Sequence, residues 1–194
     1  MKNRIQEIVD ETLARMQADN ALIGPSSLIP AEMLDNESPD SGKWNPIPSI
    51  VTDEDLDRLE GKIGLKLPPS FRTFLQYKHF DTLYLRDHAI WLPPHYPDHD
   101  LQRFQDRMLH GWGELILAGG YISFAAFVDI GFLCFDTNFP QENNEWKVVY
   151  IDHENLEVAH DYAENFLALL EGDEETSFRC IDKLNAYNGY PTVE

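Results

Sequence analysis

The sequence predicts an α+β fold, in which a central, mostly antiparallel sheet of about five or six strands is flanked by helices. Segments with apolar side chains at helical spacing lie before residue 110 and after residue 165. Between them lie four short apolar runs, rich in aromatic residues and separated by turns that contain glycine. A chain of 194 residues, 43% of them hydrophobic, is sufficient to form one such core.

The N-terminal segment is expected to be an amphipathic helix followed by an extended arm. One face of the helix carries Ile5, Ile8, Val9, Thr12, Leu13 and Met16. Asn3 and Gln6 are placed to form a capping box at its start. Five prolines between residues 24 and 48 disfavour both helix and sheet. We therefore expect residues 1–49 to form a helix and a Pro-rich arm packed on a domain of residues 50–194.

Two consecutive helices are predicted after the arm. Thr52 and Asp55 can cap the first helix at its start, and Gly64 can end it. Pro68 and Pro69 fit the first turn of the second helix, where no backbone donor is lost. The apolar face that the two helices share should be buried against the strands of residues 115–151, and it consists of Leu56, Leu59, Ile63, Phe71, Phe74 and Leu75.

The remaining elements are predicted from shorter patterns. Strands are expected at residues 83–85 and 90–92, and a short helix at residues 101–108. An antiparallel meander should comprise residues 115–118, 121–127, 132–136 and 147–152. Helices are then expected at residues 166–170 and 178–184.

A family signature is visible in the two consecutive helices. It consists of Val51–Glu60 (VTDEDLDRLE) and Ile63–Leu75 (IGLKLPPSFRTFL). This arrangement of an acidic helix with a Glu near its end, a Leu-Pro turn and an aromatic-rich helix resembles the SUKH superfamily of Smi/Knr-like proteins. Weaker matches to the strands and closing helix of that family are found at residues 122–127, 131–136, 148–154 and 165–170. The resemblance extends over about residues 50–172.

The resemblance implies a small α+β binding module without enzymatic activity. Such modules are known mostly as bacterial immunity proteins that neutralise polymorphic toxins, and also as fungal regulators of cell-wall synthesis. Two positions depart from the family pattern. Tyr77–Asp81 replaces an Asn-Gly-Gly turn, and Ala163 lies where a Ser usually opens the closing helix.

Composition excludes several classes of partner and location. The formal net charge is -19, which disfavours binding to nucleic acid or to an anionic membrane surface. No apolar run approaches the roughly 20 residues of a membrane-spanning helix, and no secretory signal is visible at the N-terminus. Because two cysteines are too few for a disulfide framework, we expect a cytoplasmic protein.

No motif predicts catalysis, a metal site or a cofactor. His88, His95 and His99 lie near aspartates, but Pro97 interrupts the segment, so we interpret it as a solvated polar loop. Residues 152–154 combine a histidine with two carboxylates at the end of an apolar strand, where a polar turn is the commoner arrangement. We therefore expect a binding protein and not an enzyme.

The distribution of charge predicts where a partner binds. Residues 51–80 hold five acids and five bases, whereas residues 116–194 hold fifteen acids and three bases. This excess indicates either a generally acidic protein or a docking face for a basic one. Trp146 in this region either anchors a partner or packs back onto the sheet. The candidate partner-binding residues are Glu142, Glu145, Trp146, Asp152, Glu154 and Glu157.

The resemblance and the charge together predict an immunity protein that binds and neutralises a basic, nuclease-like polymorphic toxin. The alternative is an intracellular scaffold or regulatory protein-interaction module of the cell-wall-regulator type.

Overall fold

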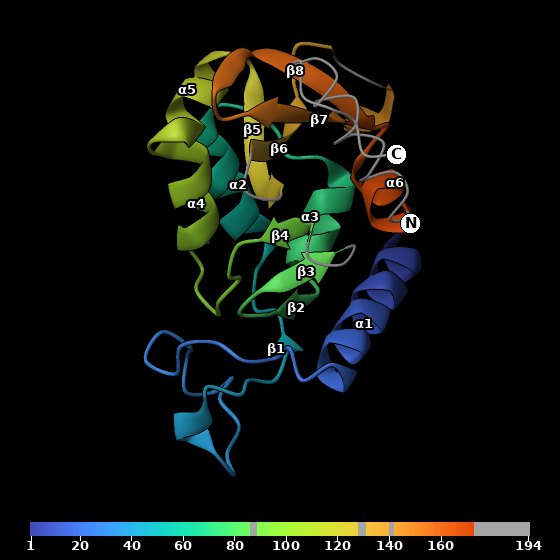
Figure 1. Cartoon of the computed structure of the whole chain (residues 1–194). Coiled ribbons are helices and arrows are strands. Elements are labelled where there is room, and N and C mark those ends of the chain that lie inside the picture. Colours follow the sequence, from blue (N-terminus) through green and yellow to red (C-terminus); the bar gives the residue numbers. More distant parts are fainter. Residues whose placement is uncertain (86–88, 128–130, 140–141, 173–194) are drawn as a thin grey trace, which may run out of the picture.

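The computed structural model describes residues 1–85, 89–127, 131–139 and 142–172. Within these residues, one antiparallel sheet contains six strands whose spatial order is their order in the chain (Figure 1). The strands are β3 (Leu83–Leu85), β4 (Ile90–Leu92), β5 (Tyr121–Phe127), β6 (Gly131–Asp136), β7 (Lys147–Asp152) and β8 (Asn155–Ala163). A separate sheet pairs β1 (Ile47–Pro48) with β2 (Lys78–His79). The predicted α+β fold is therefore confirmed.

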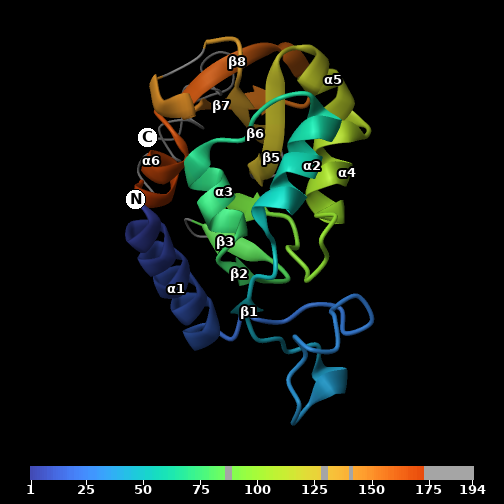
Figure 2. The same ribbon diagram turned by 180° about the vertical axis from the view of Figure 1, so that it is seen from behind.

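Helices cover the sheet on several sides. In the described residues they are α1 (Lys2–Ala18), α2 (Asp53–Ile63), α3 (Pro69–Leu75), α4 (Gln102–Leu109), α5 (Trp112–Ala118) and α6 (Phe166–Glu171), with short 3₁₀ turns η1 (Pro39–Ser41) and η2 (Glu142–Asn144). α1 contacts α3, β3 and α6, while α4 and α5 contact β5 and lie at the left of Figure 1, away from α1. α2 and α3 are in front when the molecule is viewed from behind (Figure 2). None of the described helices has the length and apolar character needed to cross a membrane.

α2 begins and ends at the caps predicted from the sequence. The hydroxyl of Thr52 accepts a hydrogen bond from the backbone N–H of Asp55, at 3.3 Å. The carboxylate of Asp55 accepts one in return from the N–H of Thr52, at 2.8 Å. Gly64 follows the helix with φ of 73°, a left-handed conformation that glycine adopts without a steric penalty. Pro69 is the first residue of α3, as predicted.

Aromatic rings fill the space between α3 and the sheet. Phe71 is fully buried, and its ring centre lies 5.0 to 5.9 Å from those of Phe74, Phe104, Phe124, Phe135 and Phe166. The apolar face predicted for α2 and α3 belongs to the same core cluster as residues of β5, β6 and β7. Its burial against the strands is therefore confirmed.

The N-terminal segment contributes to this core. α1 buries Ile5, Ile8, Val9, Thr12, Leu13 and Met16, the face predicted from the sequence. Its N-cap is Met1 without a side-chain hydrogen bond, so the predicted capping box is wrong: the helix already begins at Lys2, which places Asn3 inside its first turn. Residues 19–46 form the lower end of the molecule in Figure 1, and Trp44 in this arm is only 2% exposed.

The structure corrects one predicted strand. Residues 115–118 belong to the helix α5 and not to the meander. α5 buries Gly113 and Ile116, which are three residues apart, and leaves Leu115 59% exposed. A short apolar run does not distinguish a helix from a strand. Gly113 allows the helix here, because a Cβ at this position would lie 1.9 Å from the carbonyl oxygen of Arg107.

The pattern rules also missed the edge strand β8. Its apolar side chains alternate irregularly with polar ones, and its register against β7 shifts twice. Such bulges disrupt the strict alternation by which strands are recognised. The helix predicted at residues 178–184 lies outside the described residues.

Candidate functional site

The candidate partner-binding residues surround the β7–β8 hairpin, but they do not form one exposed surface. Asp152 closes the turn of the hairpin, is only 8% exposed and accepts a hydrogen bond from the N–H of Glu154 at 2.8 Å. The segment of residues 152–154 is thus a polar turn, as the sequence predicts. Glu154 and Glu157 are exposed. The side chain of Glu142 lies outside the described part of the chain.

Glu145 and Trp146 point inward and join the start of β7 to the region around α3. The carboxylate of Glu145 accepts hydrogen bonds from the N–H of Ser70 at 2.9 Å and from its hydroxyl at 2.6 Å. The indole Nε1 of Trp146 donates to the carbonyl oxygen of Lys66 at 2.9 Å. Of the two interpretations of Trp146, the structure has it packed against the core.

The acids of strand β8 and of the chain that follows it are not balanced by Lys or Arg within the same stretch. Residues 148–172 contain no Lys or Arg, and their acidic residues are Asp152, Glu154, Glu157, Asp161, Glu164 and Glu171. Asp161 forms an ion pair with Lys147, at 2.6 Å, and Glu171 forms one with Arg4, at 3.1 Å. Glu154, Glu157 and Glu164 have exposed carboxylates without an ion pair among the described residues. We call these three residues the β8 acidic edge.

The acids of the family signature have a different role, because they pair with nearby bases. Glu60 is 4% exposed and accepts hydrogen bonds from Lys66 at 2.6 Å, Arg72 at 2.8 Å and the N–H of Leu67 at 3.0 Å. Burial by itself would raise the pKa of Glu60, but these donors outweigh it and hold the pKa below its ordinary value. The network links α2 to α3 through the ion pairs of Glu60 with Lys66 and Arg72.

Two histidines are part of the core. His95 is 1% exposed and donates from Nε2 to the carbonyl oxygen of Leu75, at 2.7 Å. His79 donates from Nδ1 to the carbonyl oxygen of His95, at 3.2 Å, and accepts at Nε2 from the N–H of Ile50, at 3.0 Å. Burial lowers the pKa of both rings, that of His95 to about 3, so both are neutral at physiological pH.

The histidine loop does not bring ligands together for a metal. His99 pairs with the carboxylate of Asp55 at 2.8 Å, while the His95 ring is enclosed by the core. His88 lies outside the described residues. In the part of the chain that the structure describes, no three His, Cys, Asp or Glu side chains are grouped in a way that could hold a metal ion.

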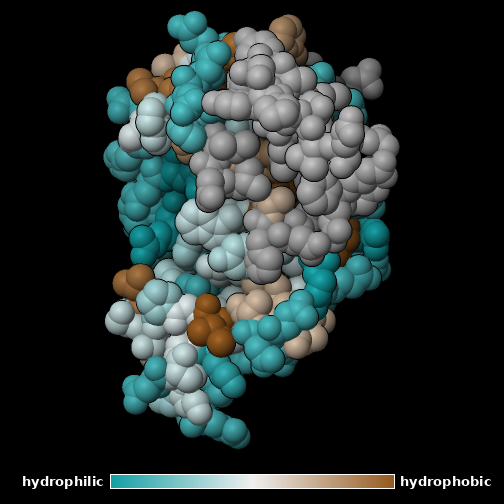
Figure 3. Space-filling view, viewed as in Figure 1, coloured by the Kyte–Doolittle hydropathy of each residue, from teal (hydrophilic) through white to brown (hydrophobic). Residues whose placement is uncertain are grey.

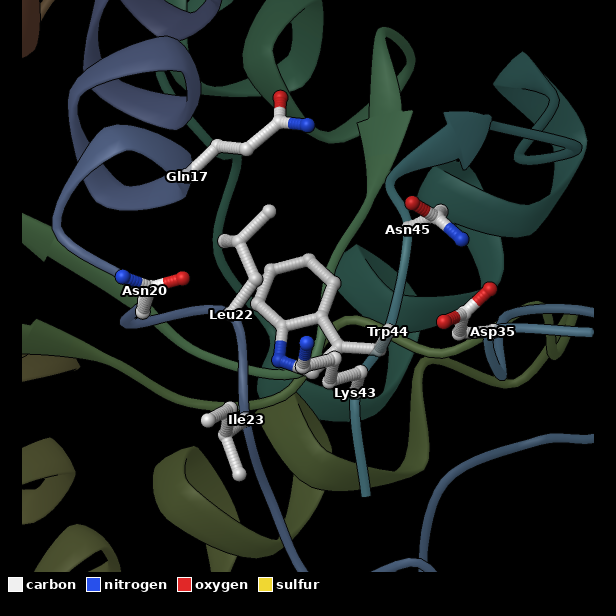
Figure 4. Close-up of a pocket in the computed structure, with 8 residues that line it drawn as sticks. All are labelled: Gln17, Asn20, Leu22, Ile23, Asp35, Lys43, Trp44 and Asn45. Carbon is white, nitrogen blue, oxygen red and sulfur yellow. The ribbon is translucent and has the colours of Figure 1, made fainter. Parts of the chain in front are cut away.

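A polar cavity of about 300 Å³ lies where the end of α1 meets the arm (Figure 4). It is lined by Gln17, Asn20, Leu22, Ile23, Asp35, Lys43, Trp44 and Asn45. Lys43 and Asp35 give the cavity one charge of each sign, and three amide side chains supply further donors and acceptors. The cavity therefore has no net charge that would favour an anion or a cation.

Sequence reasoning missed a second hollow, which has the composition of a protein-binding surface. It has a volume of about 390 Å³ and lies between β4, β6, α4 and α5. We call it the aromatic groove and define it by Trp91, Arg103, Arg107, Trp112 and Phe132. Elsewhere, hydrophobic residues form small separate patches on the mostly hydrophilic face of Figure 3. The groove residues belong to four elements, so no local sequence signal could have found them.

The comparisons with known proteins agree with the signature in α2 and α3. The model of the SMI1/KNR4 family (SUKH-1) matches residues 50–172. The match begins just before α2 and ends just after α6, and it includes the whole six-stranded sheet. A search of the curated proteins finds no match.

Proposed function

Because the chain belongs to the SMI1/KNR4 family (SUKH-1), we propose that it is a non-catalytic immunity protein that binds and neutralises a basic, nuclease-like polymorphic toxin in the cytoplasm. The observation that carries the proposal is the β8 acidic edge: Glu154, Glu157 and Glu164 are exposed on or beside an edge strand, in a stretch of 25 residues (148–172) without Lys or Arg. A toxin that holds nucleic acid presents a basic surface, to which such an edge is complementary.

Electrostatic physics supports this site for encounter with a basic partner. Exposed charges of one sign accelerate association and orient the approaching protein. Three other acids are less suited to this role, because Glu60 and Asp55 are buried and paired and Glu145 is engaged by Ser70. Of the residues proposed from the sequence, Glu154 and Glu157 therefore carry the docking proposal.

The first experiment asks whether the chain protects cells. We expect co-expression with a toxin encoded beside it to restore growth. Failure with every neighbouring toxin would contradict the proposal and favour the alternative, a scaffold or regulatory module.

The second experiment asks whether the β8 acidic edge is the docking site. The paired reversal Glu154→Lys and Glu157→Lys should slow association with the purified toxin about tenfold at low salt, with little change in dissociation. The matched control is Glu32→Lys with Glu37→Lys, which makes the same change in net charge on exposed residues of the arm. Equal slowing by both pairs would mean that overall charge, and not this edge, attracts the toxin.

A further inference from the structure

The aromatic groove leaves two tryptophan side chains partly exposed to solvent. Trp91 is 39% exposed and Trp112 is 50% exposed, and Leu115 beside Trp112 on α5 is 59% exposed. The sheet register places Trp91 next to Ala126 and Ala126 next to Phe132, so the strands supply a continuous apolar floor. The ring of Trp112 extends this floor, with its centre 6.5 Å from that of Phe132. Exposed tryptophans grouped in this way are typical of interface anchors.

Two arginines beside this floor lack acidic partners. Arg107 lies over the ring of Trp91, with its guanidinium carbon 5.7 Å from the ring centre. Arg103 lies over the ring of Tyr96 at 5.9 Å. Neither forms an ion pair with any residue that the structure describes, although the chain has 34 acidic residues. By contrast, Arg4, Arg58 and Arg72 are all paired with carboxylates.

Arg107 is a partly buried positive charge beside the floor, and among the described residues it has no carboxylate partner. Arg107 is half-buried, and burial lowers the pKa of its guanidinium relative to the ordinary value. Asp106 also lines the groove and accepts a hydrogen bond from Gln102 at 2.7 Å, but the two arginines outnumber its single negative charge. His110 is the remaining titratable group in the lining. The groove therefore offers a fixed positive charge beside an apolar surface.

We propose that the aromatic groove binds a peptide segment of a partner protein that carries a carboxylate next to an aromatic or aliphatic side chain. The carboxylate pairs with the planar fork of Arg107, which favours bidentate contacts. The apolar neighbour packs between Trp91 and Trp112. A nucleic acid or another polyanion does not fit, because the whole chain carries a net charge of -19 and repels it. This site is separate from the β8 acidic edge and goes beyond the proposed function.

The test uses a displayed library of random peptides of about twelve residues, selected on the immobilised full chain. We expect the selected peptides to share an Asp or Glu beside Leu, Phe or Trp. Replacing that acid with its amide should weaken binding at least tenfold, because it removes a charge-assisted hydrogen bond to the guanidinium. Selected peptides that lack an acid, or no selection at all, would overturn the proposal.

Substitutions in the protein test whether the selected peptides bind in the aromatic groove. Arg107→Gln should weaken the binding of the selected peptides at least tenfold. Arg107→Lys should recover only part of this loss, because lysine lacks the planar pair of donors of the guanidinium. Trp112→Ala, at a half-exposed position that tolerates truncation, should also weaken them. Arg15→Gln, on the exposed face of α1, is the matched control and should have no effect.

Peptides that bind Arg107→Gln as well as wild type would refute the site. Concentration-dependent self-association that Trp112→Ala abolishes would show instead that a second copy of the chain occupies the groove. Charge reversal at Glu154 and Glu157 should leave peptide binding intact, so this proposal and the proposed function can fail independently.

Discussion

Glu145 is one of the candidate partner-binding residues, but its contact with Ser70 predicts that it stabilises the fold instead. Both donors of Ser70 are directed at the Glu145 carboxylate, and Ser70 is fully buried. Glu145→Ala removes the acceptor and leaves a backbone N–H and a hydroxyl unpaired inside the protein. We therefore expect this substitution to lower stability and to have no direct effect on the approach of a toxin.

The size of the effect follows from the two hydrogen bonds. A hydrogen bond to a charged group contributes about 1.5–3 kcal/mol, and a buried group left unpaired costs about 1–3 kcal/mol. Because the two bonds share one half-buried carboxylate, we expect a loss of about 2–4 kcal/mol in the free energy of unfolding. For a chain of this length, that lowers the melting temperature by roughly 5–15 °C.

The assay is thermal and urea unfolding of Glu145→Ala beside wild type. Glu145→Gln should be intermediate, since the amide oxygen still accepts a hydrogen bond without the charge. Glu154→Ala is the control and should change stability by no more than about 0.5 kcal/mol, because its carboxylate is exposed. An unchanged melting temperature for Glu145→Ala, together with slower association with the toxin, would refute the structural role.

Two further predictions concern the core. Phe74→Ala should lower the free energy of unfolding by about 3–5 kcal/mol, measured by urea denaturation, because its ring is 1% exposed and packs on Phe71, Phe80 and Phe166; an unchanged urea midpoint would show that this face is not the core. Stability should also decrease as the pH falls from about 6.5 to 5. His95 has a pKa of about 3 in the folded chain and about 6.5 in the unfolded chain. As the pH falls below 6.5, the unfolded state therefore binds a proton that the folded state does not. The free energy of unfolding then decreases by up to about 1.4 kcal/mol per pH unit. Free energies of unfolding that are equal at both pH values would contradict a neutral, buried His95.

The parts of the fold that sequence predicts well are those fixed by neighbouring residues. α2 is the clearest case: Thr52, Asp55 and Gly64 act on the backbone within one helix, so their pattern alone sets its bounds. The helix α5 is the opposite case. Its apolar run of residues 115–118 is compatible with both a helix and a strand. Which of the two forms depends on the close approach of Gly113 to α4. That approach is a tertiary contact that local propensity does not contain.

The proposed binding site depends on side-chain contacts that the sequence pattern does not contain. Composition shows that acids outnumber bases in residues 116–194, because charge is a property of each residue. It could not tell Glu145, which reaches back 75 positions to Ser70, from Glu154, which faces solvent. The aromatic groove gave no signal at all, since Trp91 and Arg107 meet only when β4 and α4 pack together. Side-chain direction and long-range partners decide which of these residues are exposed, and both are properties of the folded chain.

The two binding surfaces differ in how strongly salt should affect them. Glu154 and Glu157 are exposed, so dissolved ions screen their attraction to a basic partner over a Debye length of about 8–10 Å at physiological ionic strength. Arg107 is half-buried and stacked on Trp91, so a carboxylate paired with it is shielded from the solvent ions. Raising NaCl from about 0.05 to 0.5 M should therefore slow toxin association more than about tenfold, but weaken a peptide in the aromatic groove less than about threefold. Surface plasmon resonance at several salt concentrations measures both. An equal salt dependence would mean that Arg107 acts as an ordinary surface charge and would contradict a shielded ion pair in the aromatic groove.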